Sequence, residues 1–297
     1  MKRTVIILTY LFCLCTLNAQ EYNYLEIDSN GKEKLLGQVN REGLASHTFG
    51  TWFNKNHDDY IPNEALIQEF KDSLSSYKIK VFLGTWCGDS KREVPRFYKV
   101  LDLAGFPENQ LEVIAVDRIA EAYKKSPNGE EIGLNIHRVP TFILYNNGKE
   151  INRIVEFPVE TLERDLFNIT ILKKYTPNYR AANYMGDILQ NNSISELIHD
   201  EEKLLVTLSE ITKGSSELNT LGYVKLRDLK LKEALYIFKL NTKLFPYTAN
   251  TYDSLGEANI KAKQYEKALK NYQKVLALKP DDANAMKMIS QMEGVKN

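Results

Sequence analysis

Two hydrophobic periodicities divide the chain into an N-terminal part of strands and helices and a C-terminal part of helices. In the first part, KIKVFLGTW (78–86) and QLEVIAVD (110–117) are continuous apolar runs typical of buried strands. In EALIQEFKDSLSSY (64–77), apolar residues recur at helical spacing, which indicates a helix. This alternation predicts a mixed sheet covered on both faces.

Turn residues mark where the predicted elements reverse or end. Ser-Asn-Gly at 29–31 suits a hairpin between two short strands, and Asn-Asn-Gly-Lys at 146–149 suits a second hairpin. The helix predicted after KIKVFLGTW contains Pro95, which is expected to interrupt it because proline removes a helical hydrogen bond. A closing helix is expected to begin near Pro158.

The C-terminal third contains an internal repeat with a period of 34 residues. Aligning residues 218–246 with 252–280 pairs Gly222 with Gly256, Ala234 with Ala268, Phe238 with Tyr272 and Pro246 with Pro280. Small residues at a helix crossing, an aromatic residue on the second helix and a terminal proline resemble the tetratricopeptide repeat (TPR). Because about three units are needed for stability, 181–211 is interpreted as a degenerate helical hairpin and 281–292 as a capping helix.

The first twenty residues have the pattern of a secretory signal. A charged start is followed by a short apolar run and by Ala19 at a plausible cleavage point. The apolar run is shorter than the ~20 residues needed to span a bilayer, and the bulky residues before Cys13 and Cys15 disfavour lipid attachment. We therefore expect an extracytoplasmic protein, periplasmic or secreted through a bacterial-type signal, without a membrane anchor after cleavage.

Cleavage leaves Cys87 as the single cysteine of the mature chain, in an oxidising compartment where it has no internal disulfide partner. The 297 residues carry no net charge, and 43% hydrophobic and 26% charged residues are ordinary for a globular protein. No nucleic-acid partner is therefore expected. His47, His57 and His199 have no metal-ligand spacing, so no metal or cofactor is predicted.

Two motifs carry a resemblance to a known family. GTWCGDSK (84–91) lies where a predicted strand passes into a helix, and HRVPTFILYNNGKE (137–150) follows about fifty residues later. In this order and spacing they resemble the thioredoxin superfamily. The resemblance implies an α/β thioredoxin-like domain, a mixed sheet covered by helices, and a cis-proline at Pro140 facing the thiol.

The chain is accordingly expected to combine this α/β domain with an all-α TPR helical-repeat domain. A signal peptide (1–19) precedes an N-terminal extension with a predicted hairpin (20–61). The expected order then continues with the thioredoxin-like domain (62–172), a linker (173–180), and TPR-like helical repeats with a capping helix (181–297).

Cys87 is the first candidate catalytic residue. A buried, inert cysteine is the alternative, but the first turn of a helix favours a thiolate through its free N–H groups and dipole. Lys91 and Arg92 add positive charge one turn later, and Asp89 acts in the opposite direction.

Ser90 and Trp86 complete the predicted catalytic group. Ser90 stands where two-thiol thioredoxins carry their resolving cysteine, so it is either a spacer or a hydrogen-bond donor to the sulfur. Trp86 is either a lid beside the thiol or a core residue. The acid that the family carries six residues before the first cysteine corresponds to Val81, so both parts of the two-thiol chemistry are missing together.

Val139, Pro140 and Thr141 are the predicted substrate-binding residues. In thioredoxin-like domains this segment aligns an extended partner by backbone hydrogen bonds, a form of strand addition. The neighbouring Arg138 and His137 are interpreted as solvated surface residues rather than as a thiolate partner and a catalytic base.

Two functions remain open from the sequence. In the first, Cys87 exchanges with disulfides of protein or peptide clients, giving mixed disulfides that external thiols, including low-molecular-weight ones, resolve. In the second, the fold is a non-catalytic binding or holdase-type module whose repeats supply another surface, a layout similar to chaperedoxins. A one-cysteine peroxidase is disfavoured because Cys87 has no peroxiredoxin-type Thr or Pro upstream.

Overall fold

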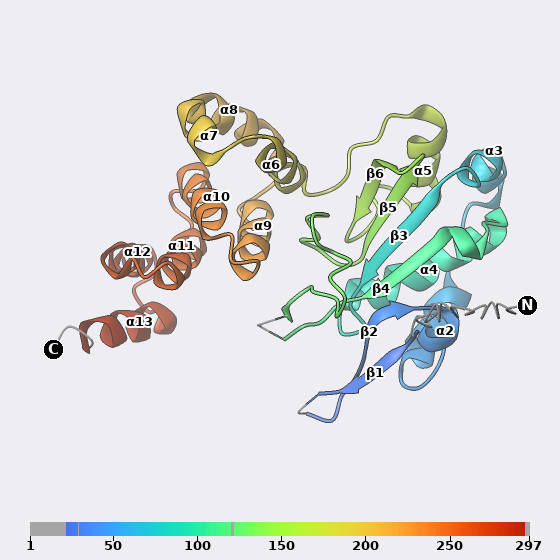
Figure 1. Ribbon diagram of the computed structural model, residues 1–297, viewed down its shortest axis with the longest axis horizontal. Helices are drawn as coiled ribbons and strands as arrows, with labels where there is room; N and C mark the ends of the chain where they lie inside the picture. The colour runs from blue at the N-terminus through green and yellow to red at the C-terminus, as the bar shows by residue number, and fades with distance from the viewer. Residues whose placement is uncertain (1–21, 29, 120–121, 295–297) are drawn as a thin grey trace, which may run out of the picture.

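The structure is a computed structural model that describes residues 22–28, 30–119 and 122–294. The predicted signal peptide at 1–19 lies outside these residues, as does Ser29 of the first hairpin turn. Figure 1 shows a sheet domain followed through a linker by a region built only of helices. No helix in the described ranges is both long and apolar enough to cross a membrane.

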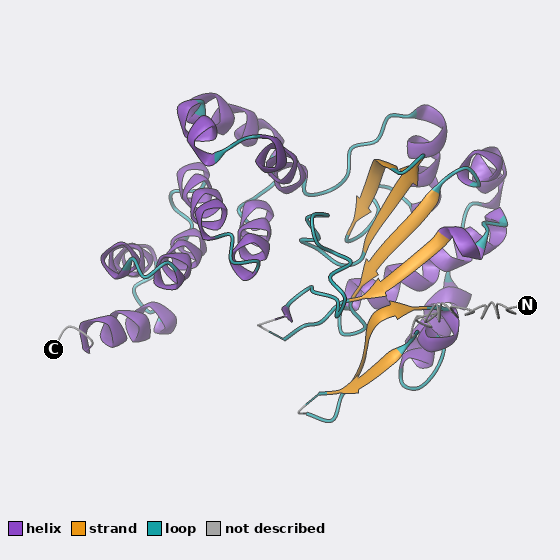
Figure 2. Ribbon diagram, in the orientation of Figure 1, coloured by secondary structure: helices purple, strands orange, loops and turns teal. Residues whose placement is uncertain are grey.

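A mixed six-stranded sheet with the order β1-β2-β4-β3-β5-β6 forms the centre of the first domain (Figure 2). Its strands are β1 (Tyr24–Ile27), β2 (Glu33–Val39), β3 (Lys78–Leu83), β4 (Leu111–Ala115), β5 (Thr141–Asn146) and β6 (Lys149–Val155). Only the central pair β3 and β4 is parallel. Both predicted hairpins are confirmed, and the first is part of the sheet because β2 pairs with β4.

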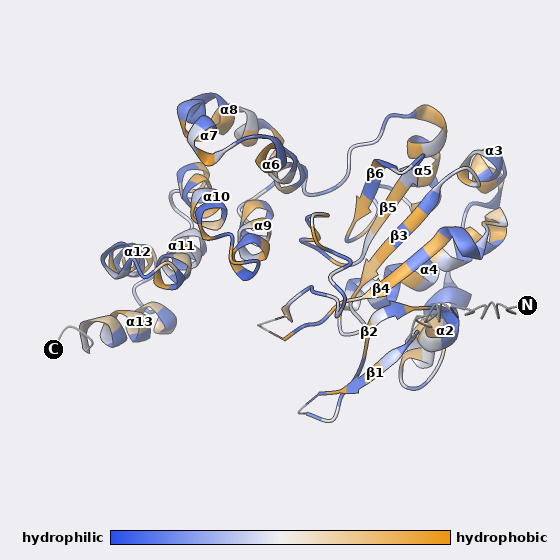
Figure 3. Ribbon diagram, viewed as in Figure 1, coloured by the Kyte–Doolittle hydropathy of each residue, from blue (hydrophilic) through white to orange (hydrophobic). Residues whose placement is uncertain are grey.

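The helices of this domain share one apolar core with one face of the sheet. They are α1 (Arg41–Leu44), α2 (Phe49–Asp59), α3 (Glu64–Leu74), α4 (Gly88–Ala104) and α5 (Leu162–Phe167), with short helical turns at Glu108–Gln110 and Asn168–Leu172. Along β3, Val81 faces this core whereas Phe82 faces a second, smaller core. Figure 3 shows the central strands coloured mostly as hydrophobic, as this double burial requires.

The second face of the sheet is also covered, as expected, and its cover is a loop segment. Its small core is completed by Ile136 and Val139 from the segment between β4 and β5, not by a layer of helices. This segment, residues 116–140, is anchored where it leaves the sheet, because the buried Lys34 pairs with Asp117 at 2.7 Å. The face of the sheet against which Trp86 and Cys87 pack is therefore covered by a loop.

The prediction that Pro95 interrupts its helix is wrong. Helix α4 runs through Pro95 for 17 residues. Proline cannot donate to the carbonyl of Lys91 four residues earlier, but the Asn56 side chain of α2 donates to that oxygen at 3.1 Å. An unsatisfied carbonyl would cost about 1–3 kcal/mol, so a partner on α2 lets the helix continue.

The C-terminal region contains eight helices in its described part. They are α6 (Arg180–Asn191), α7 (Ile194–His199), α8 (Glu201–Ile211), α9 (Ser216–Arg227), α10 (Leu231–Leu244), α11 (Ala249–Lys261), α12 (Tyr265–Leu278) and α13 (Ala283–Gly294). The pairs α9/α10 and α11/α12 carry the internal repeat. A Cβ on Gly222 would lie 2.6 Å from the Phe238 ring, and one on Gly256 would lie 2.9 Å from Tyr272. The repeated glycine and aromatic positions thus pack against each other in both pairs.

Candidate functional site

Cys87 lies at the junction between β3 and α4, as its motif predicts. It is the residue immediately before the helix, and its carbonyl accepts the first helical hydrogen bond from Lys91 N at 3.0 Å. Its own N–H donates to Gly84 O at 2.8 Å, which closes the turn after the strand. The side chain is half-buried, so the sulfur lies at the positive end of a long helix and remains reachable from solvent.

The cis-proline loop faces this sulfur. The Val139–Pro140 peptide bond is cis, which confirms the expectation drawn from the motif. The thiol donates to the carbonyl oxygen of Val139 at 3.2 Å. Two segments 52 residues apart are therefore joined at one point, and Cys87, Val139 and Pro140 form a single site.

The backbone carbonyls around Pro140 have separate partners. Thr141 Oγ1 donates to Arg138 O at 2.7 Å, and Glu156 N donates to Pro140 O at 2.7 Å. The carbonyl of Val139 between them has the thiol as its partner. If a peptide replaced the thiol as the hydrogen-bond donor, the carbonyl oxygen of Val139 would be free to accept from a peptide backbone N–H.

Ser90 is fully buried and contacts the backbone rather than the sulfur. Its hydroxyl oxygen accepts a hydrogen bond from Gly84 N at 3.1 Å. Within the described residues, no hydrogen bond joins this hydroxyl to Cys87. Ser90 thus holds the turn before the thiol, which is a positioning contact.

Trp86 covers the end of the sheet beside the thiol. Its indole Nε1 donates to Val116 O at 2.9 Å, and its ring lies 5.6 Å from that of Tyr123. A Cβ on Gly84 would lie 2.5 Å from the indole, so glycine at that position makes room for the ring. Trp86 is half-buried and therefore combines the two roles that the sequence left open.

The first turn of α4 supplies less positive charge than the sequence suggests. Arg92 pairs with Asp89 at 2.8 Å and with the buried Glu93 at 2.5 Å. Both pairs lie within the helix and leave the guanidinium neutralised. Of the two cations that the sequence places on this turn, Lys91 therefore remains without an ion pair among the described residues, whereas Arg92 is compensated.

The interpretation of His137 and Arg138 as solvated residues is wrong. His137 is 1% exposed, its Nδ1 lies 3.0 Å from Asn135 O, and burial lowers its pKa to about 3. Arg138 is half-buried, pairs with Glu156 at 3.0 Å and stacks on the Tyr179 ring at 4.8 Å. The helical region covers this loop, and its docking was not visible in the sequence.

Helix α9 makes the contacts that cover the loop. Thr220 Oγ1 donates to His137 O at 2.8 Å, and Lys225 Nζ donates to Asn135 Oδ1 at 2.9 Å. Both acceptors lie within five residues of Pro140. In Figure 1, α6 and α9 are the helices that face the sheet domain. The helical region therefore supports the segment that positions the cis-proline.

Lys124 is the residue near the site that sequence reasoning missed. It is 6% exposed, and its Nζ donates to His137 O. Burial, together with the positive charges of Arg138 and Arg227, lowers its pKa to about 7, whereas Glu156 and Cys87 act in the opposite direction. Its sequence context, a polar stretch rich in lysine, carries no signal of burial, because the groups that cover it are distant in the chain.

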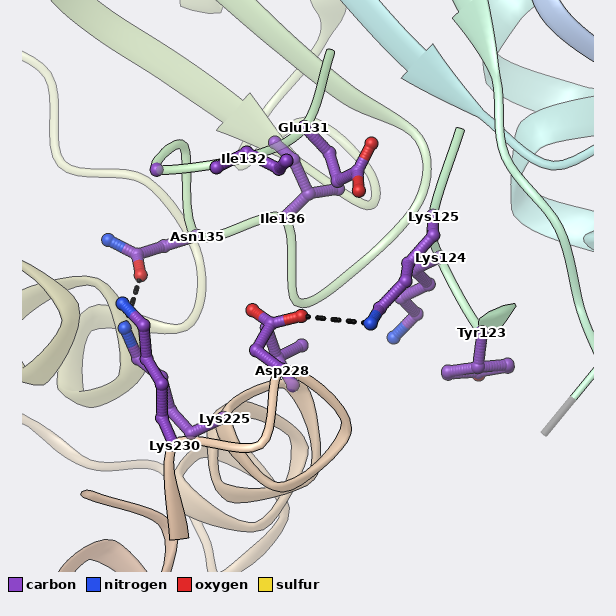
Figure 4. Close-up of a pocket in the computed structure, with 12 residues that line it drawn as sticks. Tyr123, Lys124, Lys125, Glu131, Ile132, Asn135, Ile136, Lys225, Asp228 and Lys230 are labelled. Carbon is purple, nitrogen blue, oxygen red and sulfur yellow. Dashed lines mark hydrogen bonds and ion pairs between the residues drawn. The ribbon is translucent and has the colours of Figure 1, made fainter. Parts of the chain in front are cut away.

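A small cavity of about 40 Å³ lies at the interface between the two regions. Figure 4 shows Tyr123, Lys124 and Lys125 on one side and Lys225 and Asp228 of the helical region on the other. Lys125 pairs with Asp228 at 3.4 Å across this cavity. Among the residues that the structure describes, no cluster of His, Cys, Asp and Glu could hold a metal ion.

Comparison with known proteins relates the first domain to thioredoxins. The chain is 34% identical over 107 residues to a thioredoxin of Mycoplasma genitalium, covering 92% of that protein and 34% of this chain. It is 29% identical over 89 residues to thioredoxin-1 of Schizosaccharomyces pombe, covering 77% of that protein. No protein-family model matches the chain.

Proposed function

The chain belongs to the thioredoxin family through its N-terminal domain, and we propose that it is a single-thiol protein that forms mixed disulfides with client proteins. The observation that carries this proposal is the position of Cys87. Its sulfur lies before the N-terminus of α4 and 3.2 Å from the carbonyl of Val139 at the cis-proline. The nucleophilic sulfur of Cys87 is therefore next to a carbonyl oxygen that could accept a hydrogen bond from a client backbone.

The proposed reaction is thiol–disulfide exchange. The Cys87 thiolate attacks one sulfur of a client disulfide, so a Cys87–client disulfide forms and the second client sulfur leaves as a thiolate. That thiolate, or a low-molecular-weight thiol, then attacks the mixed disulfide and releases Cys87. Each exchange step consumes one thiolate and one disulfide and yields one of each. Isomerisation, in which a different cysteine of the client attacks the mixed disulfide, therefore needs no further oxidant or reductant.

Serine at position 90 sets the lifetime of the mixed disulfide in this proposal. A hydroxyl cannot act as the resolving thiol, and that of Ser90 is engaged with the Gly84 backbone. Val81, at the position of the missing acid, is fully buried and apolar. Release therefore depends on an outside thiol, which favours long-lived complexes over rapid reduction.

The rest of the chain is proposed to serve the same role. We infer that α9 to α12 are TPR-like repeats that present a protein-interaction surface, since both helix pairs use a glycine against an aromatic ring. We also infer that residues 1–19 are a signal peptide that directs the protein outside the cytoplasm. A single cysteine in the mature chain is compatible with an oxidising compartment.

One observation favours the binding-module function as a second candidate. A groove of about 600 Å³ is lined by α7, α10, α11 and α12. Its walls combine apolar side chains such as Ile198 and Leu235 with four lysines, at positions 232, 239, 267 and 270. Such a surface suits a protein segment with apolar and acidic residues, whether or not Cys87 reacts.

Intact-mass spectrometry on protein purified without reductant tests the proposal. After incubation with disulfide-bearing peptides, the wild type should gain the mass of one peptide thiol, reversibly with reductant, and Cys87→Ser should gain none. Pro140→Ala should trap less peptide while reacting normally with small alkylating reagents. If the wild-type mass always equals that of the free thiol, the exchange function is wrong and the binding module is favoured.

A further inference from the structure

Two cationic side chains, one from each region of the molecule, pack against the ring of Tyr123. Lys124 Nζ lies 4.7 Å from the ring centroid, and the guanidinium carbon of Arg227 lies 4.3 Å from it. The same ring packs at 5.6 Å from Trp86, the residue before the reactive cysteine. The Tyr123 ring thus connects both cations to Trp86, the residue that precedes the reactive cysteine.

Two carboxylates of this region, both among the described residues, pair with other cations. Glu156 pairs with Arg138, and Asp228 pairs with Lys125. Within the described part of the chain, neither Lys124 nor Arg227 forms an ion pair; Lys124 donates to a backbone carbonyl instead. Arg227 therefore has no carboxylate partner among the described residues, and a bound anion would supply one.

We propose that the Arg227 guanidinium, held on the Tyr123 ring, is an anion-binding site near Cys87, which selects clients carrying a carboxylate beside their disulfide. This inference rests on the proposed exchange function and adds the chemical class of its substrate. Arg227 comes from the end of α9, so the helical region contributes directly to substrate choice. Because Arg227 is only half-buried, its guanidinium is accessible to a client.

The charge of the disulfide substrate distinguishes an anion-binding site from a general change in the reactivity of the Cys87 thiol. Cys87 attacks a symmetrical disulfide, forms a new disulfide with one half and releases the other half as a thiolate. A change in thiol reactivity alters the rate with every disulfide in the same direction. A lost positive charge instead slows an anionic disulfide and accelerates a cationic one.

The experiment measures mixed-disulfide formation by intact mass with three small disulfides. They are dithiobis(nitrobenzoate), which is dianionic, dithiodipyridine, which is neutral, and cystamine, which is dicationic. Arg227→Gln should react about threefold to tenfold more slowly with the anionic disulfide and faster with the cationic one, at low salt. The neutral disulfide should react at an unchanged rate, and about 0.5 M salt should remove the differences.

Two further variants control for folding and for charge at a distance. Arg227→Lys keeps the positive charge and should retain most of the selectivity. Arg164→Gln removes an arginine that also stacks on an aromatic ring, Phe167 of its own helix, and should leave all three rates unchanged.

The outcomes separate the two proposals. Equal changes with all three disulfides in Arg227→Gln, or no change with any, would overturn the anion site while leaving thiol exchange intact. If the wild type reacts with none of the three disulfides, thiol exchange itself is wrong and the anion site fails with it.

Discussion

Thr220→Val provides the sharpest test of the contact between the helical region and the cis-proline loop. Thr220 Oγ1 donates to His137 O at 2.8 Å, and valine replaces the hydroxyl by a methyl group of similar size. The His137 carbonyl keeps Lys124 as a donor, so no buried acceptor is left unsatisfied. The expected loss is that of one neutral hydrogen bond, about 0.5–1.5 kcal/mol.

That loss should weaken the docking of α9 on the loop by about twofold to tenfold. Hydrogen exchange of the backbone amides at 133–139 should rise by the same factor in Thr220→Val, because these amides are exposed when the loop opens. Trapping of disulfide-bearing peptides by Cys87 should decrease, whereas reaction with a small alkylating reagent should not change.

Thr207→Val is the matched control. Thr207 is half-buried, and its hydroxyl makes a solvent-exposed hydrogen bond of 3.1 Å to Lys203 O within its own helix α8. This variant should leave exchange at 133–139 unaltered. Equal protection of the loop in wild type and Thr220→Val would refute the idea that α9 supports the site.

Three further predictions concern packing, charge and the missing thiol. Gly222→Ala should destabilise the helical region in urea unfolding. Overpacking of the added methyl group against Phe238 should cost about 1–3 kcal/mol, which exceeds the gain in helix propensity of up to about 1 kcal/mol. Gly214→Ala is the control and should be nearly neutral, because no atom lies within 4 Å of its added Cβ. Lys124 has a folded-state pKa lowered to about 7 from 10.5, so the unfolded chain binds its proton more tightly and wild-type stability should rise from pH 7 to 10.5. That rise should be smaller in Lys124→Met, and denaturant midpoints that follow the same pH curve in both proteins would contradict it. Ser90→Cys should create weak turnover in an insulin-reduction assay where the wild type shows little; rapid wild-type turnover would exclude single-thiol chemistry.

The position of the thiol motif was predictable because it depends on local chain chemistry, whereas the cis-proline was expected through the resemblance to thioredoxins. A buried strand that ends at Leu83, followed by a short turn and a helix, places Cys87 at a helix N-terminus whatever surrounds it. The glycine and aromatic positions of the repeat were equally visible, since the helix crossing at Gly222 has no space for a Cβ. These features follow from periodicity and from steric limits within short segments.

The errors share a different cause. Pro95 was expected to interrupt its helix, and the side chain that satisfies the freed carbonyl of Lys91 is that of Asn56, 35 residues before Lys91. His137 and Arg138 were interpreted as solvated, and the cover comes from α9 and from the chain before α6. In each case a polar group obtained its partner from a segment far away in the sequence.

The sequence by itself thus determined the two kinds of architecture, the position of Cys87 and the residues next to it in the chain, because hydrophobic period, turn chemistry and motif spacing act over a few residues. Only the tertiary structure decided the electrostatic surroundings of that thiol. Lys124 and Arg227 are 103 positions apart, yet both contact the ring of Tyr123. The burial of a side chain and its distance from other charges depend on which distant segments pack together. No short stretch of the sequence shows which segments these are.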